Sequence, residues 1–230
     1  SWARYMAPTC NCRPQRIHTV NARCGSVLLN FLHETYCVFM PNLDQEKKLL
    51  RVELRARRKI AHAEISDEAE RVSAHIYEFI ESGHSGVVAG YWAVGSEISI
   101  EPVLNRLCSE GIICALPVVV DRDAGLVFRR WQPGQELGSG PLGIRQPLED
   151  AELVTPRLVL TPLLAFDTTG HRLGQGGGFY DRTLENLRAQ VGVTAVGIAY
   201  ATQQVDHIPH GPKDVKLDAV ITEQEILRIG

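Results

Sequence analysis

The sequence predicts an α/β fold with a mostly parallel central sheet. Apolar runs at residues 87–94, 112–120 and 158–166 lack polar alternation, as strands buried on both faces do. Segments with the helical spacing of apolar residues lie between these runs. Strands that alternate with helices are typical of a parallel sheet that helices cover on both faces. Ligands of such sheets bind beyond the carboxyl ends of the strands.

The composition is that of an ordinary globular chain. Of its 230 residues, 44% are hydrophobic and 22% are charged. The net charge of −3 implies no general attraction to nucleic acid or to an anionic membrane. No apolar run approaches the ~20 residues of a membrane span. Cys108 and Cys114 lie among apolar neighbours, as reduced core thiols do. We therefore expect a cytoplasmic monomer with neither nucleic-acid nor membrane partners.

Residues 1–39 are expected to be an N-terminal extension outside the folded domain. They show no sustained helical or strand period, and their Cys10-x-Cys12 spacing is not that of a zinc site. They also fit a secretory signal poorly. Strong patterning begins directly after Met40. We interpret Met40 as the natural start and residues 40–230 as one α/β domain.

Two helices are expected before the first strand. The first spans about residues 44–64, and the second begins with Ser66 as its N-cap and ends at Gly83. A third helix begins at Glu101-Pro102, after the strand at 87–94.

The second half of the domain is expected to begin with a hairpin. The strand at 112–120 pairs with residues 126–131, and residues 132–156, rich in Gly and Pro, form a surface loop. The elements expected after the strand at 158–166 are a helix at 179–190, strands at 194–200 and 217–221, and a short helix at 223–229.

A glycine-rich turn leads from the strand at 158–166 into the helix at 179–190. Its sequence from Phe166 to Asp181 is FDTTGHRLGQGGGFYD. Glycine lets a ligand approach the backbone closely, and the N–H groups at a helix start attract anions. Arg172 can form bidentate hydrogen bonds with phosphate oxygens, and Asp181 in the first helical turn can bind Mg²⁺. The turn lacks the Gly-Lys-Ser/Thr ending of a P-loop and the third glycine of a dinucleotide fingerprint. We predict a phosphate-binding loop of another kind.

Seven cations lie on the expected first helix. A run of this kind is usually a solvated face. Lys47 and Arg51, however, are four residues apart, so they project from one side of the helix and can hold one polyphosphate. The apolar face of this helix is expected to contain Leu50, Leu54 and Ile60.

Three polar loops follow expected strands, namely residues 95–97, residues 167–178 and the segment after Tyr200. We expect them to converge, because the carboxyl ends of parallel strands meet at one edge of the sheet. From spacing alone, Glu97 could equally be a surface-loop acid or a site residue. Asp218 is better explained as a strand-end carboxylate that faces water than as a site residue.

Five pieces of the chain match a known pattern in the same order. The most specific is RLGxGGGFYD at residues 172–181. The others are Lys47-x-x-x-Arg51, Gly95-Ser96-Glu97, Thr161-Pro162 before Phe166-Asp167, and VKLDAV at residues 215–220. With these pieces the chain, over about residues 46–223, resembles the family of 5-formyltetrahydrofolate cyclo-ligase, also called 5,10-methenyltetrahydrofolate synthetase.

The resemblance implies a three-layer α/β/α sandwich and an ATP- and Mg²⁺-dependent ligase. Its substrate is 5-formyltetrahydrofolate, with or without a polyglutamate tail, and ATP is the co-substrate. Phosphorylation of the formyl oxygen and ring closure by N10 yield 5,10-methenyltetrahydrofolate, ADP and phosphate.

The resemblance also implies roles for residues, carried over by position. Arg172 and Tyr180 would be catalytic, and Asp181 and Asp218 would bind Mg²⁺. The residues implied to bind ATP are Lys47, Lys48, Leu49, Leu50, Arg51, Arg172, Leu173, Gly174, Gln175, Gly176, Gly177, Gly178, Phe179 and Tyr180. The residues implied to bind the folate are Trp92, Glu97, Gln175, Gly176, Gly177, Gly178 and Phe179.

The chain departs from many relatives at Phe179, where they have Tyr, and at Gln146, where they have Glu. It also has no Trp near Leu142, where some relatives place one against the folate. Two other classes of function stay open. One is a sugar-phosphate isomerase or acyl-CoA-type transferase on a similar sandwich, which would not require ATP. The other is a non-catalytic nucleotide or folate sensor.

Overall fold

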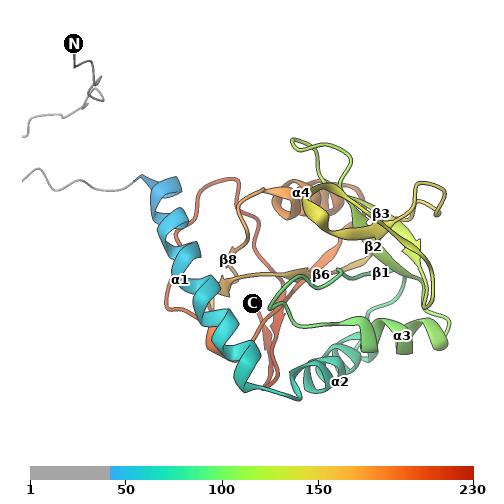
Figure 1. Ribbon diagram of the computed structural model, residues 1–230, viewed down its shortest axis with the longest axis horizontal. Helices are drawn as coiled ribbons and strands as arrows, with labels where there is room; N and C mark the ends of the chain where they lie inside the picture. The colour runs from blue at the N-terminus through green and yellow to red at the C-terminus, as the bar shows by residue number, and fades with distance from the viewer. Residues whose placement is uncertain (1–41) are drawn as a thin grey trace, which may run out of the picture. The chain divides into compact units, whose positions relative to one another are not determined.

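The predicted α/β fold with a mostly parallel central sheet is confirmed. The computed structural model describes residues 42–230, which form four α-helices and a seven-stranded mixed sheet (Figure 1). The strand order is β11-β10-β9-β6-β1-β2-β3, and the two edge strands run antiparallel to their neighbours. The predictions for residues 1–39, and for Met40 as the natural start, lie outside the described residues.

The elements have the following bounds. The helices are α1 Leu43–Glu64, α2 Glu68–Glu81, α3 Glu101–Ser109 and α4 Phe179–Val191. The strands of the large sheet are β1 Val88–Ala89, β2 Cys114–Val118, β3 Val127–Trp131, β6 Leu158–Pro162, β9 Thr194–Ile198, β10 Ala219–Ile221 and β11 Ile226–Arg228. Two short antiparallel ribbons lie beside it: β4 Leu137–Ser139 with β5 Arg145–Pro147, and β7 Ala165–Phe166 with β8 Arg172–Leu173.

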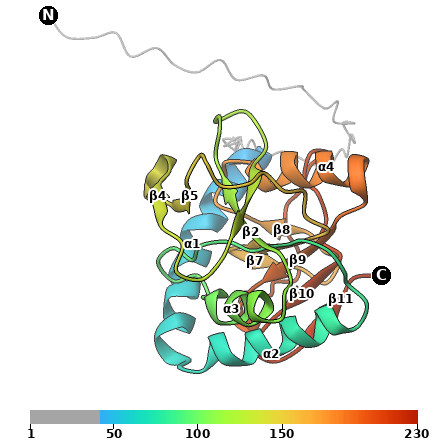
Figure 2. The same ribbon diagram turned by 90° about the vertical axis from the view of Figure 1, so that its right-hand side faces the viewer.

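Helices cover both faces of the sheet, which gives the three layers that the family resemblance implies. α2 and α3 lie on one face and α4 lies on the other, as Figures 1 and 2 show. Leu158 and Leu160 of β6 pack in one apolar cluster with Ile76 of α2. Val159, between them, packs in a second cluster with Leu184 of α4. Alternate residues of a central strand are thus buried on opposite faces, which explains why these strands are apolar throughout.

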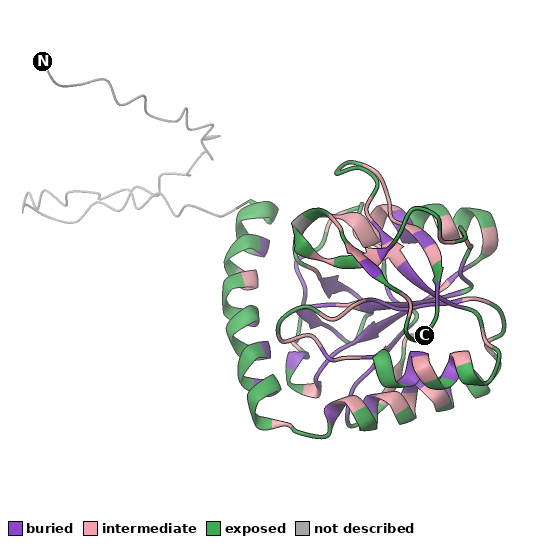
Figure 3. Cartoon of the chain, turned by 45° about the vertical axis from the view of Figure 1, so that its right-hand side comes forward, coloured by how far each residue is buried: buried purple, intermediate pink, exposed green. Residues whose placement is uncertain are grey.

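Helix α1 packs against loops at the carboxyl ends of the strands. Asn42 and Gln45 form a capping box that fixes its start. Most of its outer surface is exposed (Figure 3), and its buried residues are Lys47, Leu54, Arg58 and Ala61. The prediction that Ile60 lies on the buried face is wrong, since Ile60 is 58% exposed. Leu54 and Ala61 of this stripe pack in apolar clusters, whereas Lys47 and Arg58 are buried where α1 meets polar loops.

The predicted strand at 87–94 pairs only over Val88–Ala89. Helix α3 approaches the next residue, Gly90, so closely that a Cβ there would lie 2.7 Å from Leu104 Cδ1. Beyond Gly90 the chain leaves the sheet and lines a cavity with Tyr91, Trp92 and Val94.

Three other predictions are corrected. Ser66 is not an N-cap, because α2 begins after Asp67. The predicted surface loop at 132–156 contains the β4–β5 ribbon. The predicted helix at 223–229 is the edge strand β11, which pairs antiparallel to β10. A tight turn in which the Thr222 N–H donates to the Glu225 carbonyl separates these strands, and it leaves too few residues for a stable helix.

Cys108 and Cys114 are free thiols, as expected. Cys114 is buried, and burial raises the pKa of its thiol, so it stays protonated as a small core residue. None of the helices within residues 42–230 has the length and apolar character that crossing a bilayer requires.

Asp167 stabilises the turn between β7 and β8, which is the first part of the glycine-rich segment at residues 166–181. Its side chain accepts hydrogen bonds from the Thr169 hydroxyl and from the N–H groups of Thr169, His171 and Ile208. Burial alone would raise the pKa of Asp167, but these hydrogen bonds lower it below its ordinary value. The turn therefore depends on an ionised carboxylate inside the protein.

Asp167→Asn should reduce the free energy of unfolding at neutral pH by about 1–3 kcal/mol, since an NH₂ group replaces one acceptor oxygen. The carboxylate stabilises the fold above the unfolded-state pKa of about 4, and this stabilisation is lost as the pH falls through the lower folded-state pKa. Urea unfolding of the full chain at neutral pH and below about pH 4 measures both effects. Wild type should lose more stability on acidification than the variant, and an equal loss would contradict this role.

Candidate active site

A cavity of about 790 Å³ lies beyond the carboxyl ends of the central strands. Its walls come from α1, from residues 91–97, from β5 and from the glycine loop, which we define as residues 174–178. The predicted convergence of the 95–97 loop with the glycine-rich turn is confirmed. The segment after Tyr200 does not line the cavity, but Asp214 within it contacts α1 beside the glycine loop.

The glycine loop ends in a backbone conformation that favours glycine. Gly176 and Gly178 have φ angles of 106° and 65°, and Gly178 is the N-cap of α4. Gly178 provides no side-chain cap, and the first N–H groups of any helix have no intrahelical acceptor. The loop thus presents backbone donors at the positive end of a helix dipole, the arrangement that binds phosphate.

Arg172 is the buried centre of a charged cluster beside this loop. It is 8% exposed, and its Nη2 donates to Asp181 Oδ1 at 2.8 Å while its Nη1 donates to the Val215 carbonyl. Burial lowers the pKa of Arg172, and the negative charges of Asp181 and Asp214 oppose that lowering. A buried charge is costly unless it is paired, so these two carboxylates keep a guanidinium stable at this position.

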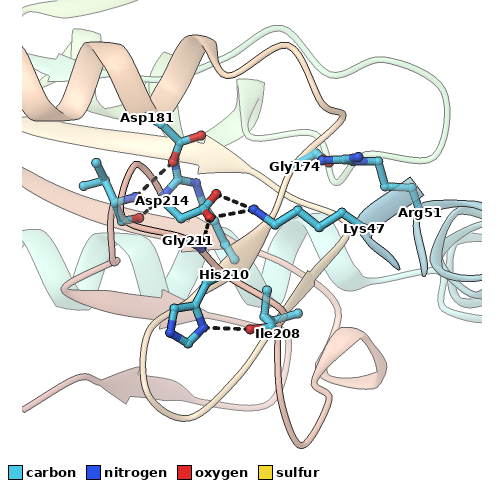
Figure 4. A network of polar contacts seen from close by, with 10 residues as sticks. Lys47, Arg51, Gly174, Asp181, Ile208, His210, Gly211 and Asp214 are labelled. Carbon is cyan, nitrogen blue, oxygen red and sulfur yellow. Dashed lines mark hydrogen bonds and ion pairs between the residues drawn. The ribbon is translucent and has the colours of Figure 1, made fainter. Parts of the chain in front are cut away.

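A second ion pair joins α1 to the loop that precedes β10 (Figure 4). Lys47 Nζ donates to both carboxylate oxygens of Asp214, at 2.7 and 2.6 Å, and the Gly211 N–H donates to the same group. Burial would raise the pKa of Asp214, but these hydrogen bonds and the charge of Arg172 lower it. Asp214 therefore carries a negative charge between two cations, Lys47 and Arg172.

Arg51 holds the glycine loop against α1. Its Nε donates to the Gly174 carbonyl at 2.9 Å (Figure 4). A Cβ on Gly176 would lie 3.3 Å from the guanidinium carbon of Arg51, so this position has little room for a side chain. Next to it, Arg55 Nε donates to the side-chain carbonyl of Gln175 at 3.0 Å. Two successive turns of α1 thus contact two successive residues of the loop.

Four of the residues that the resemblance implies to bind ATP have side chains that are exposed or packed in an apolar cluster. Lys48 and Leu49 are exposed on the outer side of α1. Leu50 and Leu173 pack in the apolar cluster that contains Leu54. Of the residues 47–51, the structure brings only Lys47 and Arg51 to the glycine loop and its charged neighbours.

Aromatic side chains and Glu97 line the same cavity as the glycine loop. Trp92, Phe179 and Tyr180 line it, and Trp92 packs edge-on against Trp131 with ring centres 6.3 Å apart. Burial, and then the charge of Glu97, raise the pKa of Tyr180. Its phenol therefore stays protonated at neutral pH, where it can donate a hydrogen bond but cannot serve as a base.

The two carboxylates implied to hold Mg²⁺ have different partners, Arg172 for Asp181 and Arg188 for Asp218. Asp218 precedes β10, where it accepts from Arg188 Nη2 at 2.7 Å and from the Ala195 N–H. Arg188 lies about two turns beyond Asp181 on α4, roughly 10 Å along the axis. The Asp218 side chain is 46% exposed, which agrees with the expectation from spacing alone. Within residues 42–230, no group of three His, Cys, Asp or Glu side chains could enclose a metal.

Sequence reasoning missed Asp214 and Arg58 as site residues, and it noted Gln146 only as a departure from relatives. Asp214 lies 167 residues from its partner Lys47, and nothing next to it indicates this pairing. Arg58 pairs with Glu97, and its spacing from Arg51 on one helix face was the available signal. Gln146 lines the cavity from β5, inside the segment predicted to be a surface loop.

Comparison with known proteins is consistent with this arrangement. Residues 43–223 match the 5-formyltetrahydrofolate cyclo-ligase family. The chain is 34% identical to the 5-formyltetrahydrofolate cyclo-ligase of Haemophilus influenzae over 179 residues, 75% of this chain and 95% of that protein. It is 37% identical to the enzyme of that name from Escherichia coli over 144 residues, 60% of this chain and 79% of that protein.

A solved structure shows the same similarity. The NMR structure of Aquifex aeolicus 5,10-methenyltetrahydrofolate synthetase is 30% identical to this chain, with a TM-score of 0.60. The match covers 78% of this chain and 93% of the Aquifex chain. The matching family segment contains α1, the glycine loop and Asp214.

Gly178→Ala should lower the free energy of unfolding by about 1–2 kcal/mol, because a left-handed conformation is unfavourable for alanine. The new Cβ would also lie 2.7 Å from Arg182 Nη1. Gly174→Ala is the matched control, since its Cβ would meet no heavy atom of the described residues within 4 Å and its φ is not positive. Urea unfolding of both variants should show a loss for the first alone. Equal stability of the two variants would disprove the assigned conformation.

Proposed function

Because the chain belongs to the 5-formyltetrahydrofolate cyclo-ligase family and is a ligase of folate metabolism, we propose that it converts 5-formyltetrahydrofolate to 5,10-methenyltetrahydrofolate with ATP and Mg²⁺. One observation carries this proposal: a single cavity is lined by the glycine loop, by arginines that include Arg172, and by aromatic side chains beside a nearly buried carboxylate, Glu97. Family membership argues against the sugar-phosphate isomerase, the acyl-CoA-type transferase and the non-catalytic sensor.

The triphosphate of ATP fits the end of the cavity next to the glycine loop. Backbone N–H groups of residues 174–178 and of the first turn of α4 supply donors there. Arg172 supplies a buried guanidinium, and Lys47 and Arg51 approach from α1. When ATP binds, Lys47 exchanges one oxyanion partner, Asp214, for another, a phosphate oxygen, so it stays paired throughout.

The folate fits beside the aromatic side chains of the cavity. The N–H groups of a pterin ring complement the two oxygens of Glu97, and its flat face can lie against Trp92 and Phe179. Gln175, Gly177 and Gly178 line the same cavity and so can contact both substrates. All these residues come from one chain, so we propose that the monomer is the active unit.

The chemistry needs the two substrates to be adjacent. A formamide oxygen is a poor leaving group, so the γ-phosphoryl group moves from ATP to the formyl oxygen and ADP is released. N10 of the same folate then attacks the activated carbon, the carbon–oxygen bond to phosphate breaks, and the N10 proton is lost. The ring closure is intramolecular, so positioning contributes much of the acceleration. The protein supplies no covalent nucleophile.

Arg172 and Tyr180 act where charge develops. The guanidinium of Arg172 is already desolvated, so its attraction for the transferred phosphoryl group is stronger than it would be in water. The protonated phenol of Tyr180 donates a hydrogen bond to oxygen atoms that gain charge during the transfer.

Asp181 fits Mg²⁺. Within residues 42–230, both hydrogen bonds to the Asp181 carboxylate end on Oδ1, which leaves Oδ2 to hold the ion. Mg²⁺ usually binds through one or two carboxylates, substrate phosphates and water rather than inside an all-protein cage. When bound, it neutralises the charge of the phosphates during transfer. We therefore propose Asp181, without Asp218, as the protein ligand.

The direct test is product formation by the full chain. With 5-formyltetrahydrofolate, ATP and Mg²⁺, the near-ultraviolet absorbance of the conjugated methenyl product should rise, and ADP should appear in equal amount. A non-hydrolysable ATP analogue should give no product, because the formyl oxygen then stays a poor leaving group. Product formed at the same rate without ATP, or ADP released without product, would refute the proposed function.

Asp181→Asn should raise the Mg²⁺ concentration for half-maximal turnover by at least about tenfold, the loss typical of a weakened metal site. Asp218→Asn makes the same chemical change at the paired carboxylate before β10 and should leave that concentration within about twofold of wild type. Turnover of the full chain is measured against Mg²⁺ concentration. A comparable shift in both variants would show that Asp218 takes part after all.

A further inference from the structure

We propose that Arg58 of α1 is a positioning residue that fixes Glu97 for recognition of the pterin ring. The inference deepens the proposed function and rests on it. Arg58 is not among the residues that the sequence predicted to bind either substrate.

The guanidinium of Arg58 is buried where three parts of the chain meet. It is 6% exposed on the inner side of α1. Its Nη1 donates to Glu97 Oε1 at 3.2 Å, and its Nε donates to the Ser96 hydroxyl at 3.1 Å. Nη1 also approaches the Leu163 carbonyl, just beyond β6, at 3.4 Å. One planar group therefore holds the 95–97 loop against the end of a central strand.

Glu97 is held at both oxygens yet keeps acceptor capacity. Its second oxygen, Oε2, accepts from the Val94 N–H at 3.0 Å, and its side chain is 10% exposed. A carboxylate has about four lone-pair sites, so each oxygen can accept another hydrogen bond from a ligand in the cavity. The two anchors fix the plane of the carboxylate, and that plane decides whether two parallel N–H groups of a pterin can reach it.

Without Arg58, Glu97 would be a nearly buried charge with no ion-pair partner among residues 42–230. Breaking a buried ion pair by removing one partner leaves the other charge uncompensated, which is strongly unfavourable. Glu97 would then either take up a proton or turn away from the cavity. Either change removes the paired acceptors on which pterin recognition depends.

The contribution of Arg58 is separable from ATP binding. Lys47, Arg51, Leu54 and Arg58 follow one face of α1, with the spacing of a buried helical stripe. Arg51 contacts the glycine loop, whereas Arg58, about 10 Å further along the axis, contacts the folate end. A change at Arg58 should therefore affect one substrate and spare the other.

The test compares steady-state kinetics of full-length variants. Arg58→Ala should raise KM for 5-formyltetrahydrofolate at least about tenfold, while KM for ATP stays within about twofold. Glu97→Gln should raise the folate KM by a similar factor. Adding Arg58→Ala to Glu97→Gln should raise it little further, because both changes remove the same contact. The matched control is Arg57→Ala, an exposed cation on the same helix, which should match wild type.

Arg58→Lys keeps the charge but lacks the planar group whose separate nitrogens donate to Ser96 and Glu97, so it should give a smaller rise in folate KM alone. It keeps the test valid if the alanine variant fails to fold. Equal rises in both KM values, or additive effects of Arg58→Ala and Glu97→Gln, would overturn the inference. An active wild type with unchanged folate KM in the Arg58 variants would overturn this inference alone, whereas an inactive wild type would overturn the proposed function.

Discussion

The charge on the buried guanidinium of Arg172 is the constraint on which the rest of the site depends. A cation that is 8% exposed needs carboxylates beside it, and Asp181 of α4 and Asp214 of the loop before β10 provide them. Asp214 in turn binds Lys47, so the same charge balance attaches α1 to the body of the protein. Few apolar side chains hold α1 in place, and its buried stripe is half cationic. We propose that a phosphate oxygen of ATP replaces Asp214 at Lys47, which leaves this cation paired.

The sheet explains why these groups meet. Its central strands are parallel and buried on both faces, so the loops that follow β1, β6 and β9 leave the same edge. The antiparallel strands β3 and β11 close the two sides of the sheet. The chain after β6 turns back as the β7–β8 ribbon before it enters the glycine loop, and Asp167 fixes that turn. The order of the strands thus delivers both ends of the cavity to one edge, where α1 spans them.

Local patterns predicted much of this structure, and long-range pairing accounts for what they missed. The fold class, the glycine loop and the placement of Lys47 and Arg51 on one side of a helix all depend on residues close in sequence. The partner of Lys47 lies 167 residues away and that of Arg58 lies 39 residues away, so only the fold reveals them. The motif around Asp218 does not show that this carboxylate lies at the start of β10, where it pairs with Arg188. The predicted helix at 223–229 failed because pairing with β10 outweighs the weak helical preference of so short a segment.

The most direct test of the central claim is a crystal structure of the full chain with Mg²⁺ and a non-hydrolysable ATP analogue. The account predicts that the phosphates lie on the N–H groups of residues 174–178, with Arg172 in contact and Lys47 moved from Asp214 to a phosphate oxygen. A triphosphate bound elsewhere, for example in the 390 Å³ groove between β3 and α4, with Lys47 still on Asp214, would contradict it.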